Sequence, residues 1–570
     1  MLPYINTRMF EILVPEFYPF QPLVDATGAS IDELKLIFSF LLSYPLAGIL
    51  KRIPDSKPWA KDVFIIASSL FYIVGLFDLW EGIRTLFIAA AGTYIIAKYV
   101  EGPLMPWLGF AFAMGHMSAN HIIRQMIDDP SVVDITGAQM VLVMKLTAFC
   151  WNVHDGRQPQ EELSEKQKYA ALKELPGLLD YAAYVLFFPS LFGGPSFDYM
   201  DYHRWIQTTL FDCPPGTDPA KAPRTRKSRK IPRSARPALR KLVEGLAWIF
   251  AFLQLSAYFP TDLPLSDEFM THCFPVRVLL MYAVGFAARS KYYAVWKLTE
   301  GACILCGMGY NGFNQETGEV YWNALENVDP WSLETAQNPR AYLGSWNKNT
   351  NHWLRNYIYV RVTPKGKKPG FRASMATFGT SAFWHGFYPG YYLTFVLGSL
   401  IQTAAKHFRR HVRPFFFTTG ENPVPTAKKP IYDVLSWIVT QLTLSFCVAP
   451  FITLRFKLSL LVWARLYFFG VIGVVGSLIF FSSGGSKLLK EQLDKRSVRK
   501  LRQREEQEQA GCISDKGEPI LGLSEDVGQD INEAVQEIGK EISARQRAGS
   551  TVEMPTGANL RRAVDEKLKR

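Results

Sequence analysis

Apolar residues in this chain gather in long runs that are separated by polar and charged segments. A helix needs roughly 20 mostly apolar residues to cross the hydrocarbon core of a bilayer. Some runs are shorter or contain a charge, which is typical of tilted or inward-lining membrane helices. We therefore expect roughly 9 to 12 membrane helices. The runs cover residues 32–50, 62–80, 83–99, 104–121, 138–151, 178–193, 242–259, 276–288, 373–386, 390–404, 432–454 and 459–482.

The polar segments divide the chain into a membrane body and a tail. Residues 1–482 are expected to form one multi-pass helical body, interrupted by a basic loop at about residues 212–241. Repeated prolines in this loop break helices, so we expect it to be extended or disordered. From about residue 483 the composition becomes polar and highly charged, which predicts a cytoplasmic tail over 483–570. The predicted fold class is an all-α, multi-pass membrane bundle.

The chain carries a formal net charge of +12, although 48% of its residues are hydrophobic. Such a charge could indicate nucleic-acid binding, but the basic residues lie in loops between the apolar runs. The densest group, Lys221–Lys241, has ten Lys and Arg residues and no acidic residue. An excess of Lys and Arg is typical of cytoplasmic loops in membrane proteins. We therefore expect a cytosolic loop that contacts anionic membrane lipids, and no nucleic-acid partner.

His385 is a candidate for chemistry because it follows an apolar run, Met375–Trp384. An ionisable residue at membrane depth is costly and usually faces a functional cavity. Burial disfavours the charged imidazole, and a neutral ring can accept a proton. Gly386 and Gly390 leave room for a substrate or for a neighbouring helix. Chemistry alone leaves two possibilities, a catalytic base or a histidine that hydrogen-bonds another helix.

The second candidate is the segment Ser345–Arg361, SWNKNTNHWLRNYIYVR. The amide of an asparagine such as Asn347 can donate to a developing oxyanion without losing a proton. Basic side chains, including Arg355 and Arg361, would suit a phosphate-rich co-substrate on the cytosolic side. Further lysines occur at Lys348, Lys365, Lys367 and Lys368. An ordinary interfacial amphipathic helix would explain the same pattern without chemistry.

Cys303 and Cys306 form a CxxC pair that could suggest a metal or redox site. Zinc sites of this type need a second pair of ligands, and none accompanies these cysteines. We therefore expect them to pack within a helix and expect no bound metal.

The two candidate segments together resemble a known family. A Trp-Asn pair ending at Asn347 is followed 38 residues later by the histidine of Trp-His-Gly, and then by PGYYLTF. This pattern resembles the membrane-bound O-acyltransferase (MBOAT) superfamily. Four further blocks, in family order, resemble the fungal lysophospholipid acyltransferases of that superfamily. They are WNVHDGR (Trp151–Arg157), FFPSLFGGPSFDYMDY (Phe187–Tyr202), EGACILCGMGYNGF (Glu300–Phe313) and ETAQNPRAYLGSWN (Glu334–Asn347).

The resemblance implies a fold, a site and a reaction. The fold is an MBOAT-like bundle with an intramembrane reaction chamber, located in the endoplasmic reticulum membrane. The reaction moves a fatty acyl group from acyl-CoA, as co-substrate, to the free hydroxyl (mainly sn-2) of a lysophospholipid in phospholipid synthesis and remodelling, without a bound cofactor. His385 would be the general base and Asn347 would orient the reacting groups or support the oxyanion. Substrate contacts are expected from Trp346, Trp353, Arg355, Arg361, Trp384, Tyr391 and Tyr392.

Two alternatives differ from this expectation. An enzyme of the same superfamily could instead acylate a sterol, a diacylglycerol or a protein. A transporter could use His385 as a proton relay, although transporters often contain paired repeats and the chain has no evident internal repeat.

Overall fold

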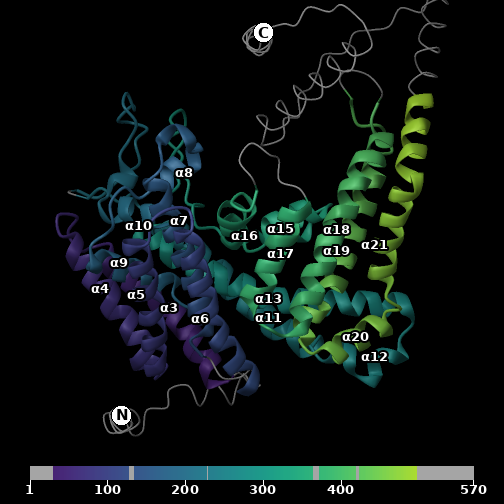
Figure 1. Ribbon diagram of the computed structural model, residues 1–570, viewed down its shortest axis with the longest axis horizontal. Coiled ribbons are helices and arrows are strands. Elements are labelled where there is room, and N and C mark those ends of the chain that lie inside the picture. Colours follow the sequence, from purple (N-terminus) through teal and green to yellow (C-terminus); the bar gives the residue numbers. More distant parts are fainter. Residues whose placement is uncertain (1–29, 128–133, 228, 364–370, 419–422, 497–570) are drawn as a thin grey trace, which may run out of the picture. The chain divides into compact units, whose positions relative to one another are not determined.

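The computed structural model describes residues 30–127, 134–227, 229–363, 371–418 and 423–496. Over these residues the protein is built from nineteen α-helices, joined by loops and short 3₁₀ or π-helical turns, without an extended strand (Figure 1). The predicted all-α class is therefore confirmed.

A first group of helices comes from the N-terminal part of the described chain and encloses an apolar core. Buried aromatic side chains such as Phe149, Tyr184 and Trp205 fill this core. Helix α7 is buried along most of its length, so it lies at the centre of the group. The elements are α3 (Ile31–Leu50), α4 (Pro58–Leu70), η1 (Phe71–Leu76), α5 (Trp80–Tyr99), α6 (Met105–Ile127), α7 (Thr136–Gly156), η2 (Gln160–Glu162), α8 (Glu165–Ala170), α9 (Leu178–Val185), η3 (Phe188–Ser190), α10 (Tyr199–Ile206) and η4 (Thr209–Phe211).

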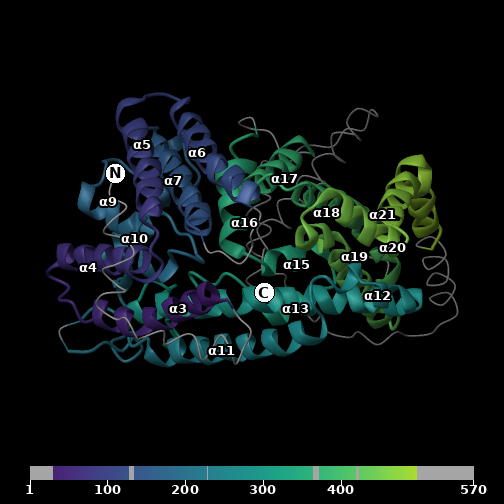
Figure 2. The same ribbon diagram turned by 90° about the horizontal axis from the view of Figure 1, so that it is seen from below.

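Two long helices, α11 (Ala235–Tyr258) and α13 (Phe274–Cys306), lie side by side (Figure 2). The C-terminal half of α13 packs closely on α3 at Gly301. A Cβ added to this glycine would lie only 2.0 Å from the hydroxyl of Tyr44. The N-terminal half packs on α19 (Lys429–Thr453), where Gly285 approaches Ser445. Helix α13 thus connects the first group of helices with the second. The short elements η5 (Leu263–Leu265) and α12 (Asp267–Thr271) lie between α11 and α13 in the chain.

The second group follows α13 and has its own core, which includes Phe446 and Trp463. A further apolar cluster joins α16 and α17 to α6 and α7, with Met114, Trp353 and Trp384 among its members. This cluster positions the two candidate segments against the first group. The elements are α14 (Pro330–Glu334), α15 (Pro339–Ser345), α16 (Lys348–Leu354), η6 (Arg355–Tyr359), α17 (Phe371–His385), α18 (Pro389–His411), η7 (Arg413–Phe416), α19, α20 (Phe456–Arg465), α21 (Phe469–Phe480) and η8 (Phe481–Gly485).

Five described helical segments are long and apolar enough to cross a membrane. Their outer faces carry exposed apolar side chains, for example Val439 (62% exposed) and Ile472 (64%), as expected for helices that contact lipid. The other long helices, α5, α6, α7, α13 and α18, are more polar, so the expected total number of spans stays a prediction. The five segments are Ile31–Leu50, Pro58–Leu76, Ala235–Leu265, Lys429–Thr453 and Phe469–Arg496.

Helix α13 extends well beyond the apolar run predicted at 276–288, and its buried charges explain why. Arg289 donates two hydrogen bonds of 2.9 Å to Glu334. Lys297 lies 3.8 Å from the carboxylate of Glu300 within the same helix. Paired charges can be buried at much lower cost than single ones. The helix therefore continues through residues at which hydropathy alone predicts an end.

Two other boundaries differ from the prediction. The run at 459–482 is split between α20 and α21, because Tyr467 and Phe468 adopt left-handed backbone angles between them. The basic loop is helical from Ala235, since Pro237 lies in the first turn of α11, where its missing N–H is not needed. Of the expected tail, residues 486–496 are helical after a kink at Ser483 and Gly484, and residues 497–570 lie outside the described part of the chain.

Candidate active site

His385 is the last residue of α17, and its ring is partly buried. The Nδ1–H donates a hydrogen bond of 2.6 Å to the backbone carbonyl of Ser381, one turn earlier. Because a carbonyl can only accept, Nδ1 must carry the proton, which leaves the lone pair on Nε2. No described residue hydrogen-bonds Nε2. The ring is therefore held in a tautomer in which Nε2 is the basic nitrogen, and no described residue blocks it.

Aromatic rings from two other helices surround this imidazole. Tyr391 and Phe395 of α18 lie with their ring centroids 5.7 and 5.1 Å from that of His385. Phe451 of α19 lies at 5.1 Å. Tyr391 was predicted to contact substrate, whereas Phe451 was not identified because it is one aromatic residue in a long apolar run. An apolar wall next to a base suits a substrate with a hydrocarbon chain.

The turn after His385 is compact and depends on two glycines. Gly386 has φ +119°, a backbone conformation that favours glycine. The Gly390 N–H donates to the carbonyl of Leu454 at 2.8 Å, which attaches the start of α18 to the end of α19. A Cβ at Gly390 would lie 2.0 Å from the carbonyl oxygen of Pro450. The local backbone therefore has no space for a side chain at this position.

Gly390→Ala is accordingly expected to destabilise the protein by about 1–3 kcal/mol, because a Cβ cannot fit against fixed backbone atoms. Thermal unfolding of the detergent-purified protein would measure this change. Gly398→Ala on the same helix is the matched control, since its Cβ would lie no closer than 3.9 Å to a neighbouring atom. The control should unfold at the wild-type temperature or slightly above it. Equal unfolding temperatures for the two variants would contradict the packing argument.

Asn347 occupies the N-cap position of α16 with φ 45° and ψ 54°, in the left-handed region. Asparagine tolerates this conformation better than most residues. The backbone carbonyl of Asn347 accepts a hydrogen bond of 3.0 Å from Asn351 N–H. Among the described residues, its side-chain amide has no hydrogen-bond partner. The amide is thus available to a ligand.

The residues that follow Asn347 are fixed by a preceding loop. The backbone carbonyl of the buried Asn327 accepts from Lys348 N–H at 2.8 Å. Its side-chain oxygen accepts from Asn349 N–H at 3.1 Å. The ammonium group of Lys348 pairs with Glu326 at 3.1 Å, so it is not a free cation for phosphate. Asn327 was not identified from the sequence, because a buried loop asparagine has no local pattern.

Trp353 and Trp384 hold the two candidate segments together. Their ring centroids lie 6.2 Å apart, and they are only 2% and 5% exposed. The indole N–H of Trp353 donates to Thr147 Oγ1 at 2.9 Å, and that of Trp384 donates to the Met140 carbonyl at 2.9 Å. Both acceptors belong to α7. These two tryptophans therefore fix α16 and α17 on the same helix. Their predicted contact with substrate stays a prediction.

Arg361 was expected to bind phosphate, but its guanidinium is engaged by the protein. It forms a bidentate ion pair with Asp155 at the end of α7, in which Nη1 lies 2.8 Å from Oδ1. It also lies 4.3 Å from the ring centroid of Trp151, and its side chain is 9% exposed. Arg355, by contrast, is exposed. Lys365, Lys367 and Lys368 lie outside the described residues.

The remaining predicted contacts lie in different surroundings. Trp346 packs against α13, with its ring centroid 4.8 Å from that of Trp296. Tyr392 is 36% exposed, so much of its side chain faces outward. Of the predicted aromatic residues, Trp384 and Tyr391 have rings next to that of His385, with centroid distances of 4.6 and 5.7 Å.

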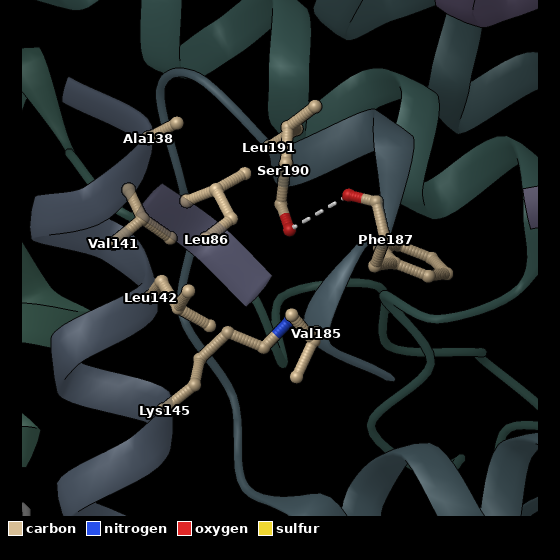
Figure 3. Close-up of a pocket in the computed structure, with 9 residues that line it drawn as sticks. All are labelled: Leu86, Ala138, Val141, Leu142, Lys145, Val185, Phe187, Ser190 and Leu191. Atoms are coloured by element: carbon tan, nitrogen blue, oxygen red, sulfur yellow. Dashed lines mark hydrogen bonds between the residues drawn. The ribbon is translucent and has the colours of Figure 1, made fainter. Parts of the chain in front are cut away.

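A small cavity beside α7 contains the buried side chain of Lys145 (Figure 3). Its amino group donates to the carbonyl of Tyr184 and lies 4.3 Å from the ring centroid of Phe197. The cavity volume is about 10 Å³, which is enough for about one water molecule. Neither His385 nor Asn347 lines it. This cavity is therefore not the expected reaction chamber.

Comparison with known proteins identifies the family of this chain. The MBOAT, membrane-bound O-acyltransferase family matches residues 130–449, which include both Asn347 and His385. The chain is 43% identical over 476 residues to the lysophospholipid acyltransferase of Saccharomyces cerevisiae, covering 82% of this chain and 77% of that protein. It is also 43% identical over 466 residues to the lysophospholipid acyltransferase of Schizosaccharomyces pombe, covering 82% and 89%.

A more distant human relative is the membrane-bound glycerophospholipid O-acyltransferase 2. It is 30% identical over 456 residues, which cover 79% of this chain and 84% of the human protein. These matches extend over most of the membrane body and are not confined to the Trp-His-Gly motif. The chain therefore belongs to the membrane-bound O-acyltransferase family.

Proposed function

We propose that this protein transfers a fatty acyl group from acyl-CoA to the free hydroxyl, mainly at sn-2, of a lysophospholipid. The two yeast relatives named as lysophospholipid acyltransferases support the acceptor class. The observation that carries the proposal is the imidazole of His385, in which Nδ1 is engaged by Ser381 and Nε2 has no partner among the described residues. Such a ring can accept a proton from a hydroxyl.

In the proposed reaction, His385 moves the proton and Asn347 stabilises the developing negative charge. The Nε2 lone pair of His385 takes the proton of the acceptor hydroxyl while that oxygen attacks the thioester carbonyl carbon. The carbonyl oxygen becomes an oxyanion, to which the Asn347 amide donates a hydrogen bond. The tetrahedral intermediate then collapses, the C–S bond breaks, and the imidazolium returns its proton to the leaving sulfur. The products are a diacyl phospholipid and free CoA, and neither a covalent acyl-enzyme nor a bound cofactor is required.

The surroundings of the site support this substrate class. The rings of Tyr391, Phe395 and Phe451 offer an apolar surface on which an acyl chain could lie beside His385. We propose that transfer occurs in an intramembrane chamber at this point, with acyl-CoA entering from the cytosolic face and the lysophospholipid entering laterally. The basic segment Lys221–Lys241 would then face the cytosol. We further propose the endoplasmic reticulum membrane as the location, in agreement with phospholipid synthesis and remodelling.

The test is acyl transfer by the detergent-purified protein, offered a panel of lysophospholipids with different headgroups and several acyl-CoAs. We expect equal amounts of diacyl phospholipid and free CoA to form. Acylation of a sterol, a diacylglycerol or a peptide, but of no lysophospholipid, would contradict the proposed acceptor. The absence of transfer to any acceptor would contradict the enzyme assignment and favour a transporter.

A further inference from the structure

We infer that His121 of α6 is a positioning residue for His385, an inference that rests on the proposed function. His121 lies far from the Trp-His-Gly motif in the sequence, yet its ring meets the turn that contains His385. It is 6% exposed, so its polar atoms are removed from solvent. A buried imidazole of this kind needs a partner for its N–H.

The first contact is a hydrogen bond to the residue before His385. The Nε2 of His121 lies 3.1 Å from the backbone oxygen of Trp384, so Nε2–H donates to it. Helix α17 ends at His385, and the last carbonyls of a helix have no donor within the helix itself. His121 therefore supplies the donor that this carbonyl lacks, and fixes the end of α17 from a different helix.

The second contact is with the residue after His385. A Cβ added at Gly386 would lie 3.0 Å from Nδ1 and 3.3 Å from Cγ of His121. The imidazole thus packs directly on the Cα of Gly386, where an added Cβ would make tight contacts with the ring. Both neighbours of His385 are therefore held by one side chain.

These two contacts determine where the basic nitrogen of His385 lies. The hydrogen bond to Ser381 sets the rotation of the His385 ring, and His121 holds the backbone from which that ring projects. A catalytic group displaced by about 1 Å can lose on the order of 10²-fold in rate. Loss of the donor at His121 should therefore lower the rate of the chemical step without changing how either substrate binds.

The experiment compares His121→Met and His121→Gln in acyl transfer by the purified enzyme. The two side chains have similar length, but only glutamine can donate to the Trp384 carbonyl. We expect His121→Met to lower kcat on the order of 10- to 100-fold, with KM unchanged for acyl-CoA and lysophospholipid. His121→Gln should recover most of kcat. The control is His116→Met on the same helix, because His116 pairs with Gln139 and not with α17.

The outcomes separate this inference from the proposed function. A folded His121→Met enzyme with wild-type kcat would overturn the positioning role, as would equal loss in a folded His121→Gln enzyme. If the methionine variant does not fold, the glutamine variant decides: wild-type kcat supports the inference and a lowered kcat in folded protein overturns it. Transfer by the wild type that is lost in His385→Ala would still support the proposed function in each case.

Discussion

Replacing His385 with alanine is expected to lower kcat for acyl transfer by about 10²–10⁴-fold. The reason is that the variant lacks the Nε2 lone pair, which would otherwise take the proton of the acceptor hydroxyl beside the aromatic wall of Tyr391, Phe395 and Phe451. Binding of acyl-CoA should persist, because the imidazole acts mainly on the proton transferred during attack. The measurement is steady-state CoA release by the detergent-purified enzyme, together with equilibrium binding of acyl-CoA.

His272→Ala is the matched control for this experiment. His272 is an exposed histidine before α13, outside the candidate site, so its loss should leave kcat unchanged. A His385→Ala enzyme that keeps more than about one tenth of the wild-type kcat would be too active for the loss of a general base. That result would assign proton removal to another group.

Arg361→Ala is expected to destabilise the protein by about 3–5 kcal/mol, because the buried Asp155 carboxylate loses its bidentate arginine partner and keeps only His154, whose Nδ1 lies 3.7 Å away. The pair is almost fully removed from solvent, with side chains 9% and 2% exposed. It also links the end of α7 to the segment after η6. Thermal unfolding in detergent would report the loss, and KM for acyl-CoA measured below the unfolding temperature should not rise.

Two further variants test whether the stability loss comes from the buried ion pair. Arg355→Ala, in η6, removes an exposed arginine and should change stability little. The double variant Asp155→Ala, Arg361→Ala should be more stable than either single variant, because no uncompensated charge then stays buried. If Arg361→Ala instead raised KM for acyl-CoA and left unfolding unchanged, the arginine would bind a phosphate of the co-substrate, as its sequence context suggested.

The helices could be predicted from the chain because apolar runs of the right length have few other stable conformations. The C-terminal end of α13 could not be predicted in this way. The helix continues past Arg289 because Glu334, from another helix, pairs with that arginine. Hydropathy counts a charge as unfavourable wherever it occurs. Only the folded arrangement determines whether that charge finds a partner.

Some residues of the candidate site could likewise be predicted from the sequence, and others could not. His385 and Asn347 could be selected because a buried imidazole and a cluster of amides are unusual next to apolar runs, and because their spacing resembled a family. Asn327, His121 and Phe451 could not be selected, since each acts through a contact with a distant segment. No periodicity or local motif encodes such a contact.

The sequence by itself determined the helical membrane body, the family and the two residues proposed for chemistry, because these depend on composition, spacing and motif order. Only the tertiary structure decided the roles of the flanking residues. It buries Trp353 and Trp384, whose indole N–H groups donate hydrogen bonds to α7. It pairs Arg361 with Asp155 and brings His121 to the turn at His385. The physical reason is that a side chain's role depends on which partners fill its hydrogen bonds and contacts, and those partners are adjacent only in the folded chain.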